Sequence, residues 1–397
     1  MIFFMKCILM NKNVEVLVAS YNESLKVFTK VYEVKNISYA PLIIFNDYFI
    51  NKDITPVLSE WFKRRGIPAW RDDLDLLLAK LDVSSPEELL DKAFGLSLSD
   101  QYWVKPVDSN ILYEDINFFE HDFEDSDFTN ATFSNGFDSS TKISLISPNN
   151  TTDGRLKKTW IIQNNKRYLL KGAYKNEVMQ PFYEVLASMI CKRLGFEHVT
   201  YTLDVVSDKV VSKCECFIDT NTELIPAQQV LAYCDKKENA YEEYIRILEE
   251  KGINNVRRNL ENMFILDYLI LNEDRHLNNF GIIRDVDTLK WVSMAPIFDN
   301  EQSLNILDYN DEELVINGQG RFFYTIDDFD SILLKIKDLK RFDLSRLDGV
   351  VEEFDDLLHK YQSITKMTDR RINKICTLLM SRVNKLKRLQ KEKYEDM

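Results

Sequence analysis

Hydrophobic positions in the first part of the chain switch from strand spacing to helix spacing. Residues 14–18 and 25–28 flank the polar turn Asn22-Glu23-Ser24, which predicts a β-hairpin. Between about residues 56 and 95 the apolar residues recur at helical spacing, and Ser84-Ser85-Pro86-Glu87 is typical of a helix start. We therefore expect an N-terminal region of strands followed by helices.

The middle of the chain has the pattern strand, turn, strand, helix, strands. Residues 160–162 and 168–171 flank Asn164-Asn165, a pair that tolerates positive φ and favours a hairpin turn. We expect a helix from Gln180-Pro181 to Gly195, then two strands. These strands are predicted at residues 200–206 and 210–217. Beyond about residue 226 we expect mainly helix, with one hairpin between Phe280 and Val292.

One predicted helix is apolar on nearly every face and runs into a polar cluster. Its apolar residues are Leu260, Met263, Phe264, Leu266, Leu269 and Ile270, and Asp267 is the polar exception. Asp274 and Asn279 follow, and the predicted hairpin returns Asp299 toward Asn279. Phosphoryl-transfer enzymes often use one carboxylate to orient the attacking hydroxyl, and an amide and a second carboxylate to hold Mg²⁺. The spacing therefore predicts phosphoryl transfer.

A second candidate site lies upstream of this cluster. Residues 151–158 contain two Thr, one Gly and two Lys, a composition that could fold over phosphates but also occurs in solvated loops. Lys171 ends an apolar strand, and Glu184 lies in the helix that follows. A strand Lys that pairs with a helix Glu while contacting nucleotide phosphates is the arrangement of kinases.

Composition narrows the class of protein. The 397 residues favour two or three domains, and 45% hydrophobic content with 11 Gly and 9 Pro indicates packed cores. A formal net charge of −13 argues against nucleic-acid binding through bulk charge. Met1 to Met10 is too short to span a membrane and is not typical of a signal peptide. We expect either a strand there or a start assigned upstream of the true one at Met5 or Met10, and a cytoplasmic protein without membrane contact.

Three further patterns each leave two interpretations open. Cys214 and Cys216 could ligate a metal, but reduced buried thiols fit better because no second Cys/His pair has zinc spacing. Residues 114–127 could form a calcium loop, but they lack its register and favour an aromatic-anchored surface segment. The basic C-terminal helix could contact DNA or membrane, but an exposed amphipathic helix fits the acidic chain better.

The motifs together resemble the HipA-like serine/threonine kinases, a bacterial family, and in particular its Firmicutes-type members. The resemblance rests on residues 272–281 and 296–300, on Gly154, Lys158, Trp160 and Lys171, and on residues 184–187. Residues 95–103 and 115–119 add to it. It implies an α+β, bilobal protein-kinase-like fold with a mixed β/α N-terminal domain and a mainly helical C-lobe. We expect an accessory domain at 1–110, an N-lobe at 111–220 and a C-lobe at 221–397.

The resemblance also implies roles for individual residues, with ATP and Mg²⁺ as cofactors. Asp274 is similar to the catalytic base, and Asn279 and Asp299 to the metal ligands. Arg275 and His276 brace the catalytic loop. The ATP-binding residues that the resemblance implies are Lys171 with its partner Glu184, the phosphate loop with Thr151, Thr152, Gly154 and Lys158, and an apolar hinge strand with Cys216 and Phe217. Thr151 or Thr152 would be the autophosphorylation site.

Two departures from the family pattern bear on activity. The phosphate loop has a single Gly, and Glu301 stands where many relatives carry Gly after the metal aspartate. If that position needs positive φ, a Glu there is strained by about 1–2 kcal/mol. We expect an ATP- and Mg-dependent protein kinase, with an unidentified protein substrate, an antitoxin or other regulatory partner, and no direct nucleic-acid binding. A degenerate pseudokinase that acts as a binding protein, and a small-molecule or lipid kinase or adenylyl transferase, stay open as alternatives.

Overall fold

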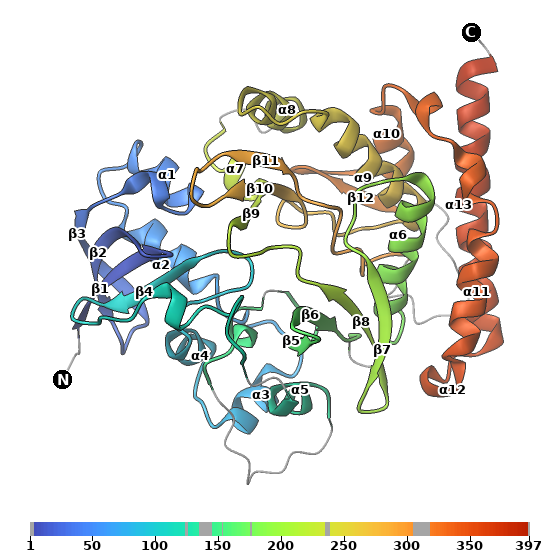
Figure 1. Cartoon of the computed structure of the whole chain (residues 1–397). Coiled ribbons are helices and arrows are strands. Elements are labelled where there is room, and N and C mark those ends of the chain that lie inside the picture. The colour runs from blue at the N-terminus through green and yellow to red at the C-terminus, as the bar shows by residue number, and fades with distance from the viewer. Residues whose placement is uncertain are drawn as a thin grey trace. The chain divides into compact units, whose positions relative to one another are not determined.

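The computed structural model of the chain describes residues 4–123, 126–134, 145–152, 154–174, 177–234, 239–304 and 318–395 (Figure 1). These residues form two compact units, each of which is described by itself. The first unit comprises Met1–Lys171, Glu215–Tyr233 and Ile282–Ser293. The second comprises Gly172–Cys214, Cys234–Gly281 and Met294–Met397. The three domain ranges expected from the sequence stay a prediction.

The N-terminal sheet of the first unit has apolar residues on both faces. It contains β1 (Phe4–Asn11), β2 (Val14–Asn22), β3 (Val27–Val34) and β4 (Tyr102–Pro106), in the order β3-β2-β1-β4 with antiparallel neighbours. Because side chains alternate along a strand, Leu17 and Ala19 enter one buried cluster, while Val18 enters another with Trp103. The strand expected near the N-terminus and the hairpin expected between residues 14 and 28 are confirmed.

Short helices pack around this sheet and around the segment that follows it. They are α1 (Leu42–Tyr48), α2 (Thr55–Lys63), α3 (Leu74–Leu81), α4 (Pro86–Lys92), α5 (Ser126–Phe133) and α7 (Ala227–Val230), with 3-10 turns at Ile37–Tyr39, Tyr113–Asp115 and Pro148–Thr151. Ser85 caps α4 by accepting a hydrogen bond from the Glu88 N–H, as its sequence predicts. Phe118, Phe119 and Phe123 pack into the Trp103 cluster, so the aromatic-anchored segment is confirmed.

Two smaller strand groups complete the first unit. The β5 (Lys158–Gln163) and β6 (Lys166–Lys171) hairpin turns at Asn164 and Asn165, whose φ angles are 52° and 61°. A three-stranded sheet has the order β11-β10-β9, with β9 at Thr222–Pro226, β10 at Gly281–Asp285 and β11 at Trp291–Met294. The hairpin expected between Phe280 and Val292 is therefore confirmed.

The second unit is mainly helical. Its helices are α6 (Gln180–Leu194), α8 (Ala240–Glu250), α9 (Val256–Ile270), α10 (Phe329–Leu334), α11 (Val350–Lys360), α12 (Gln362–Thr365) and α13 (Asp369–Glu395), with 3-10 turns at Leu339–Arg341 and Leu344–Leu347. Its strands are β7 (Tyr201–Val206), β8 (Lys209–Glu215), β12 (Gln319–Phe322) and β13 (Thr325–Asp328). Helix α13 buries Ile372, Leu379 and Leu386, as expected of an amphipathic helix.

Two expectations about the strands were wrong. The β12–β13 hairpin is a second one beyond residue 226, where only one was expected. Strand β8 ends at Glu215, so Cys216, Phe217 and Ile218 do not form a hinge strand. The Cys216 thiol donates to the carbonyl oxygens of Leu98 (3.4 Å) and Ile218 (3.3 Å), contacts that a regular strand would not provide.

The six cysteines all lie within the described ranges, and none of them is joined to another in a disulfide. Burial raises the pKa of Cys7 and Cys216 to about 12, so both are neutral thiols near pH 7. In the parts of the chain that the structure describes, no helix has the length and apolar character needed to cross a bilayer.

Candidate active site

The end of α9 determines where the candidate catalytic loop begins. The helix is buried from Leu260 to Ile270 except at Asn262, and Leu271 ends it in the left-handed conformation with φ 51° and ψ 51°. Asp267, its expected polar exception, is 3% exposed and accepts a hydrogen bond from Asn272 Nδ2 at 3.0 Å. A rigid, buried helix thus holds the first residue of the loop.

Hydrogen bonds within the loop bring Asp274 and Asn279 together. The Asp274 N–H donates to Asn272 Oδ1 (3.1 Å), and the Asp274 carbonyl oxygen accepts from the His276 N–H (2.7 Å). Asn279 Nδ2 donates to the same carbonyl at 2.9 Å. Because the amide nitrogen is committed to the backbone, Oδ1 is the atom of Asn279 that could ligate a cation.

Arg275 connects the loop to both neighbouring segments. Its fully buried guanidinium forms an ion pair with Asp267, with Nη2 to Oδ1 at 2.9 Å. Nη1 donates to the carbonyl oxygens of Asn279 (2.9 Å) and Phe298 (2.6 Å). Nη2 also donates to Asn300 Oδ1 at 2.6 Å. One side chain therefore fixes the catalytic loop to the segment that carries Asp299.

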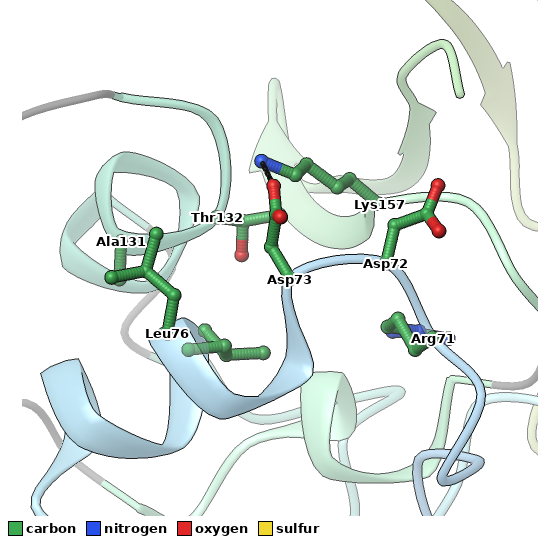
Figure 2. Close-up of a pocket in the computed structure, with 8 residues that line it drawn as sticks. Arg71, Asp72, Asp73, Leu76, Ala131, Thr132 and Lys157 are labelled. Atoms are coloured by element: carbon green, nitrogen blue, oxygen red, sulfur yellow. Dashed lines mark ion pairs between the residues drawn. The ribbon is translucent and has the colours of Figure 1, made fainter. Parts of the chain in front are cut away.

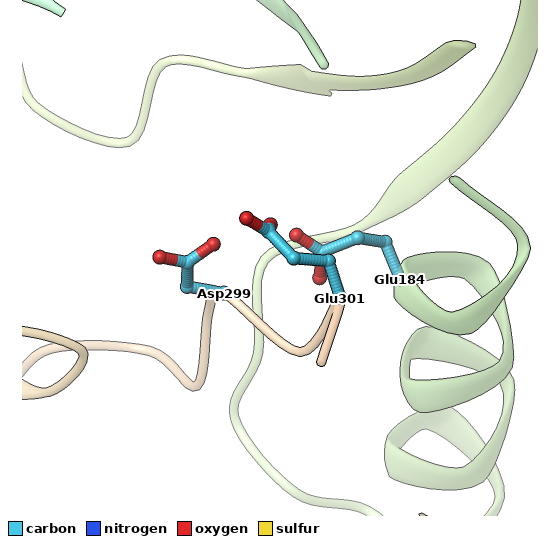
Figure 3. A group of neighbouring side chains, drawn as sticks. All are labelled: Glu184, Asp299 and Glu301. Carbon is cyan, nitrogen blue, oxygen red and sulfur yellow. The ribbon is translucent and has the colours of Figure 1, made fainter. Parts of the chain in front are cut away.

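Asp299 lies in a group of three carboxylates, shown in Figure 3. One oxygen each of Glu184, Asp299 and Glu301 lies within 4.8 Å of the other two. Glu184 comes from α6, and one of its oxygens accepts from the Asn300 N–H (2.8 Å) and from Asn300 Nδ2 (3.2 Å). The structure thus joins Glu184 to the segment of the expected metal ligand. Its pairing with Lys171, which belongs to the other unit, stays a prediction.

The expected strain at Glu301 is absent. Positive φ occurs at Asp299 itself, with φ 59°, and not at Glu301. The left-handed residue of this turn is thus two positions earlier than the family pattern suggested, and Asp is one of the side chains that tolerates this conformation. Glu301 is buried, and it contributes a carboxylate to the group in Figure 3.

Charged groups bracket the Asp274 carboxylate. His276 Nε2 lies 3.8 Å from Oδ2, and Arg321 Nε from β12 lies 3.4 Å from Oδ1. Burial raises the pKa of Asp274, and the negative charge of Asp299 adds to this rise. The positive charge of Arg321 opposes it, as does that of His276 when the imidazole is protonated. The sequence pattern gave no sign of Arg321, because it lies outside every motif.

The expected phosphate-contacting residues lie in the first unit. Lys158 and Lys171 are direct partners across the β5–β6 hairpin, and both are buried. Cross-strand partners share one face of a hairpin, so the two ammonium groups lie on the same side. Thr151 Oγ1 donates to the carbonyl oxygens of Leu96 (2.9 Å) and Pro148 (3.0 Å), and Thr152 is buried. Asp153, in the same loop, lies outside the described residues.

Three features of the chain are typical of a protein-kinase-like fold. They are the buried helix that leads to Asp274 and Asn279, the acidic segment with Asp299 after a hairpin, and the hairpin that carries Lys158 and Lys171. A solved structure supports this fold. HipA from Shewanella oneidensis MR-1, in a complex with HipB and operator DNA, matches with a TM-score of 0.56 and 14% identity, over 97% of this chain and 99% of HipA. The chain therefore has the α+β kinase-like fold of HipA, which confirms the fold expected from its motifs.

A second solved structure, the proinflammatory kinase CtkA of Helicobacter pylori, matches with a TM-score of 0.49 and 18% identity, over 60% of this chain and 94% of CtkA. No protein-family profile matches the sequence, and no curated protein matches it in sequence.

Proposed function

We propose that the chain is an ATP- and Mg²⁺-dependent serine/threonine protein kinase. The observation that carries the proposal is the buried Arg275 guanidinium, which binds Asp267, the Asn279 carbonyl and the segment of Asp299 at the same time. This side chain keeps a candidate base, an amide ligand and a carboxylate ligand in one rigid arrangement. Positioning and charge neutralisation supply most of the rate enhancement in phosphoryl transfer.

The residues present fit a magnesium ion. Carboxylate and amide oxygens are the hard ligands that Mg²⁺ prefers, and Asn279, Asp299, Glu184 and Glu301 supply such oxygens. Asn279 and Asp299 would hold the ion, and the two glutamates would add negative charge beside it. The bound ion would neutralise the charge of the nucleotide phosphates.

Asp274 would accept the proton of the substrate hydroxyl. The hydroxyl oxygen forms a bond to the γ-phosphorus, and the bond from that phosphorus to the β–γ bridging oxygen breaks, so ADP leaves. Lys171 and Lys158 would contact the phosphates. Thr151, Thr152 and Gly154 would belong to the loop that covers them, and Cys216 and Phe217 would lie beside adenine. The positive charge of Arg321 favours the ionised form of Asp274 that this role requires, as does His276 when it is protonated.

Labelled ATP separates this proposal from its alternatives. Purified protein is incubated with Mg²⁺, a mixture of protein substrates and ATP carrying label in either the α or the γ phosphate. Transfer of γ label to Ser or Thr supports the kinase, whereas transfer of α label would establish an adenylyl transferase. Stabilisation by ATP and Mg²⁺ without transfer of either label would establish a nucleotide-binding pseudokinase.

A regulatory protein partner is part of the proposal. Its support is that HipA was solved together with HipB and operator DNA, within a toxin–antitoxin system. Co-expression with the products of neighbouring genes, followed by affinity purification and size-exclusion chromatography, tests this part. A stoichiometric complex supports a partner, and elution of the chain alone in every combination counts against one. The partner's binding to DNA is then measured with and without the chain.

A further inference from the structure

Arg71, which precedes α3, forms hydrogen bonds with the candidate phosphate loop. Its Nη1 donates to Thr152 Oγ1 at 2.6 Å, its Nη2 to the Thr152 carbonyl, and its Nε to the Gly154 carbonyl at 3.1 Å. Arg71 is 5% exposed and Thr152 4% exposed, so water does not compete for these bonds. The loop is therefore fixed by a buried cation from a distant part of the sequence.

The residues next to Arg71 extend this contact. The Asp72 N–H donates to the Arg155 carbonyl at 3.1 Å, and the Asp73 carboxylate pairs with Lys157 at 2.7 Å. Figure 2 shows this ion pair at the edge of a surface pocket lined by residues 71–73. Carbonyl groups of Thr152, Gly154 and Arg155 thus all bind residues 71–72.

Peptide geometry determines what the other side of the loop presents. In a trans peptide the C=O and N–H groups point in opposite directions. Because the Gly154 and Arg155 carbonyls face residues 71–72, the N–H groups of Arg155 and Leu156 face away from them. Gly154 has φ 93°, a backbone conformation that glycine adopts readily and other residues avoid, so this turn depends on the glycine.

A cation lies at the same turn. A Cβ atom on Gly154 would lie only 2.6 Å from Lys158 Nζ, so the ammonium group lies directly against the glycine. Gly154 is required for its φ angle, and its missing side chain leaves room for the Lys158 ammonium group. An ammonium group in a turn whose carbonyls are held from the other side suits the phosphates of a nucleotide.

We propose that Arg71 is a positioning residue for nucleotide binding, which holds the carbonyl groups of Thr152 and Gly154 and thereby fixes the turn that presents Lys158 to the phosphates. The proposal rests on the kinase function proposed above and identifies the part of the first unit that prepares its phosphate loop. Arg71 acts only through the loop, so its loss should reduce nucleotide affinity more than the rate of transfer.

The test compares Arg71→Ala, Arg71→Lys and the control Arg64→Ala in the full-length chain. Arg64 is an exposed arginine that pairs with Glu60 on α2, so its loss removes the same charge without touching the loop. We expect Arg71→Ala to raise the Kd for a non-hydrolysable ATP analogue and the KM for ATP by about tenfold or more, with kcat within about threefold. Arg71→Lys should lie between, because the donors of an ammonium group share one nitrogen and cannot reach both Thr152 and Gly154 as the separate nitrogens of the guanidinium do. Arg64→Ala should change neither constant.

Hydrogen exchange gives a second readout that needs no nucleotide. Amides of residues 154–157 should exchange faster in both Arg71 variants than in Arg64→Ala, while the β1–β4 sheet keeps its protection and shows that the unit is folded. Equal Kd values for wild type and the Arg71 variants, with unchanged exchange in the loop, would overturn the role of Arg71 and leave the kinase proposal standing. A wild-type protein that binds no nucleotide would overturn both this role and the kinase proposal.

Discussion

The ion pair between Arg275 and Asp267 gives the sharpest prediction about stability. Both side chains are buried, and the guanidinium also satisfies the Asn279 and Phe298 carbonyls. Arg275→Leu would leave the Asp267 carboxylate buried without its cation. Breaking a buried pair in this way costs about 3–5 kcal/mol. A domain has a total stability of only about 5–15 kcal/mol, so the second unit should be strongly destabilised.

A double-mutant cycle tests whether the pair itself causes the loss. Arg275→Leu, Asp267→Leu and the double variant are unfolded in urea and followed by circular dichroism. The double variant leaves no unpaired charge, so its loss should be smaller than the sum of the single losses by about 2–3 kcal/mol. Arg246→Ala is the control, because Arg246 pairs with Glu243 and Glu250 on the exposed surface of α8 and its loss should have no measurable effect.

The Arg275→Lys variant tests whether the site needs only the positive charge of Arg275 or also the shape of its guanidinium group. The ammonium group keeps the ion pair but cannot reach Asp267, two carbonyls and Asn300 together. We expect a folded protein whose kcat falls about 100-fold, because a small displacement of a catalytic group has effects of this size. Additive losses in the cycle, or an Arg275→Lys variant with wild-type kcat, would refute the reasoning that Arg275 holds the site together.

Three further predictions concern other parts of the chain. Glu301→Gln removes one of the three clustered carboxylates and should weaken Mn²⁺ binding about tenfold, as measured by electron paramagnetic resonance, whereas equal affinity would exclude Glu301 from the metal site. Gly154→Ala should cost about 1–2 kcal/mol in urea unfolding, because its φ is 93°, and an unchanged midpoint would contradict that strain. Arg284→Leu leaves the buried Glu223 unpaired and should cost about 3–5 kcal/mol, while Lys166→Ala, on an exposed pair, should change little.

Local patterns in the sequence predicted the elements that carry the site. The apolar period of α9, the Asn164-Asn165 turn and the Gly195 helix end depend on neighbouring residues, and the structure confirms them. Asp274 and Asn279 lie in one short loop, and a single hydrogen bond from Asn279 to the Asp274 carbonyl brings them together. The fold expected from these motifs is the fold that the solved HipA structure shares.

Contacts between distant segments were not predictable in the same way. Nothing near Arg71 in the sequence indicates that it binds Thr152, and nothing near Arg321 indicates that it reaches Asp274. The expectation for Glu301 was wrong because the turn's positive φ falls on Asp299. The buried Asp267 did carry a signal, because an acid in an apolar helix requires a cationic partner and Arg275 follows that helix.

Transfer of γ label from ATP by wild type, Asp274→Asn and Glu273→Gln tests the central claim most directly. Glu273 is the acid next to Asp274, and burial raises the pKa of both carboxyl groups. The Glu273→Gln variant therefore controls for the loss of one carboxyl group at this place in the chain. We expect wild type and Glu273→Gln to transfer the label to Ser or Thr, and Asp274→Asn to lose transfer while it still binds ATP and melts at a similar temperature. Undiminished transfer by Asp274→Asn would contradict the assignment of Asp274 as the catalytic base.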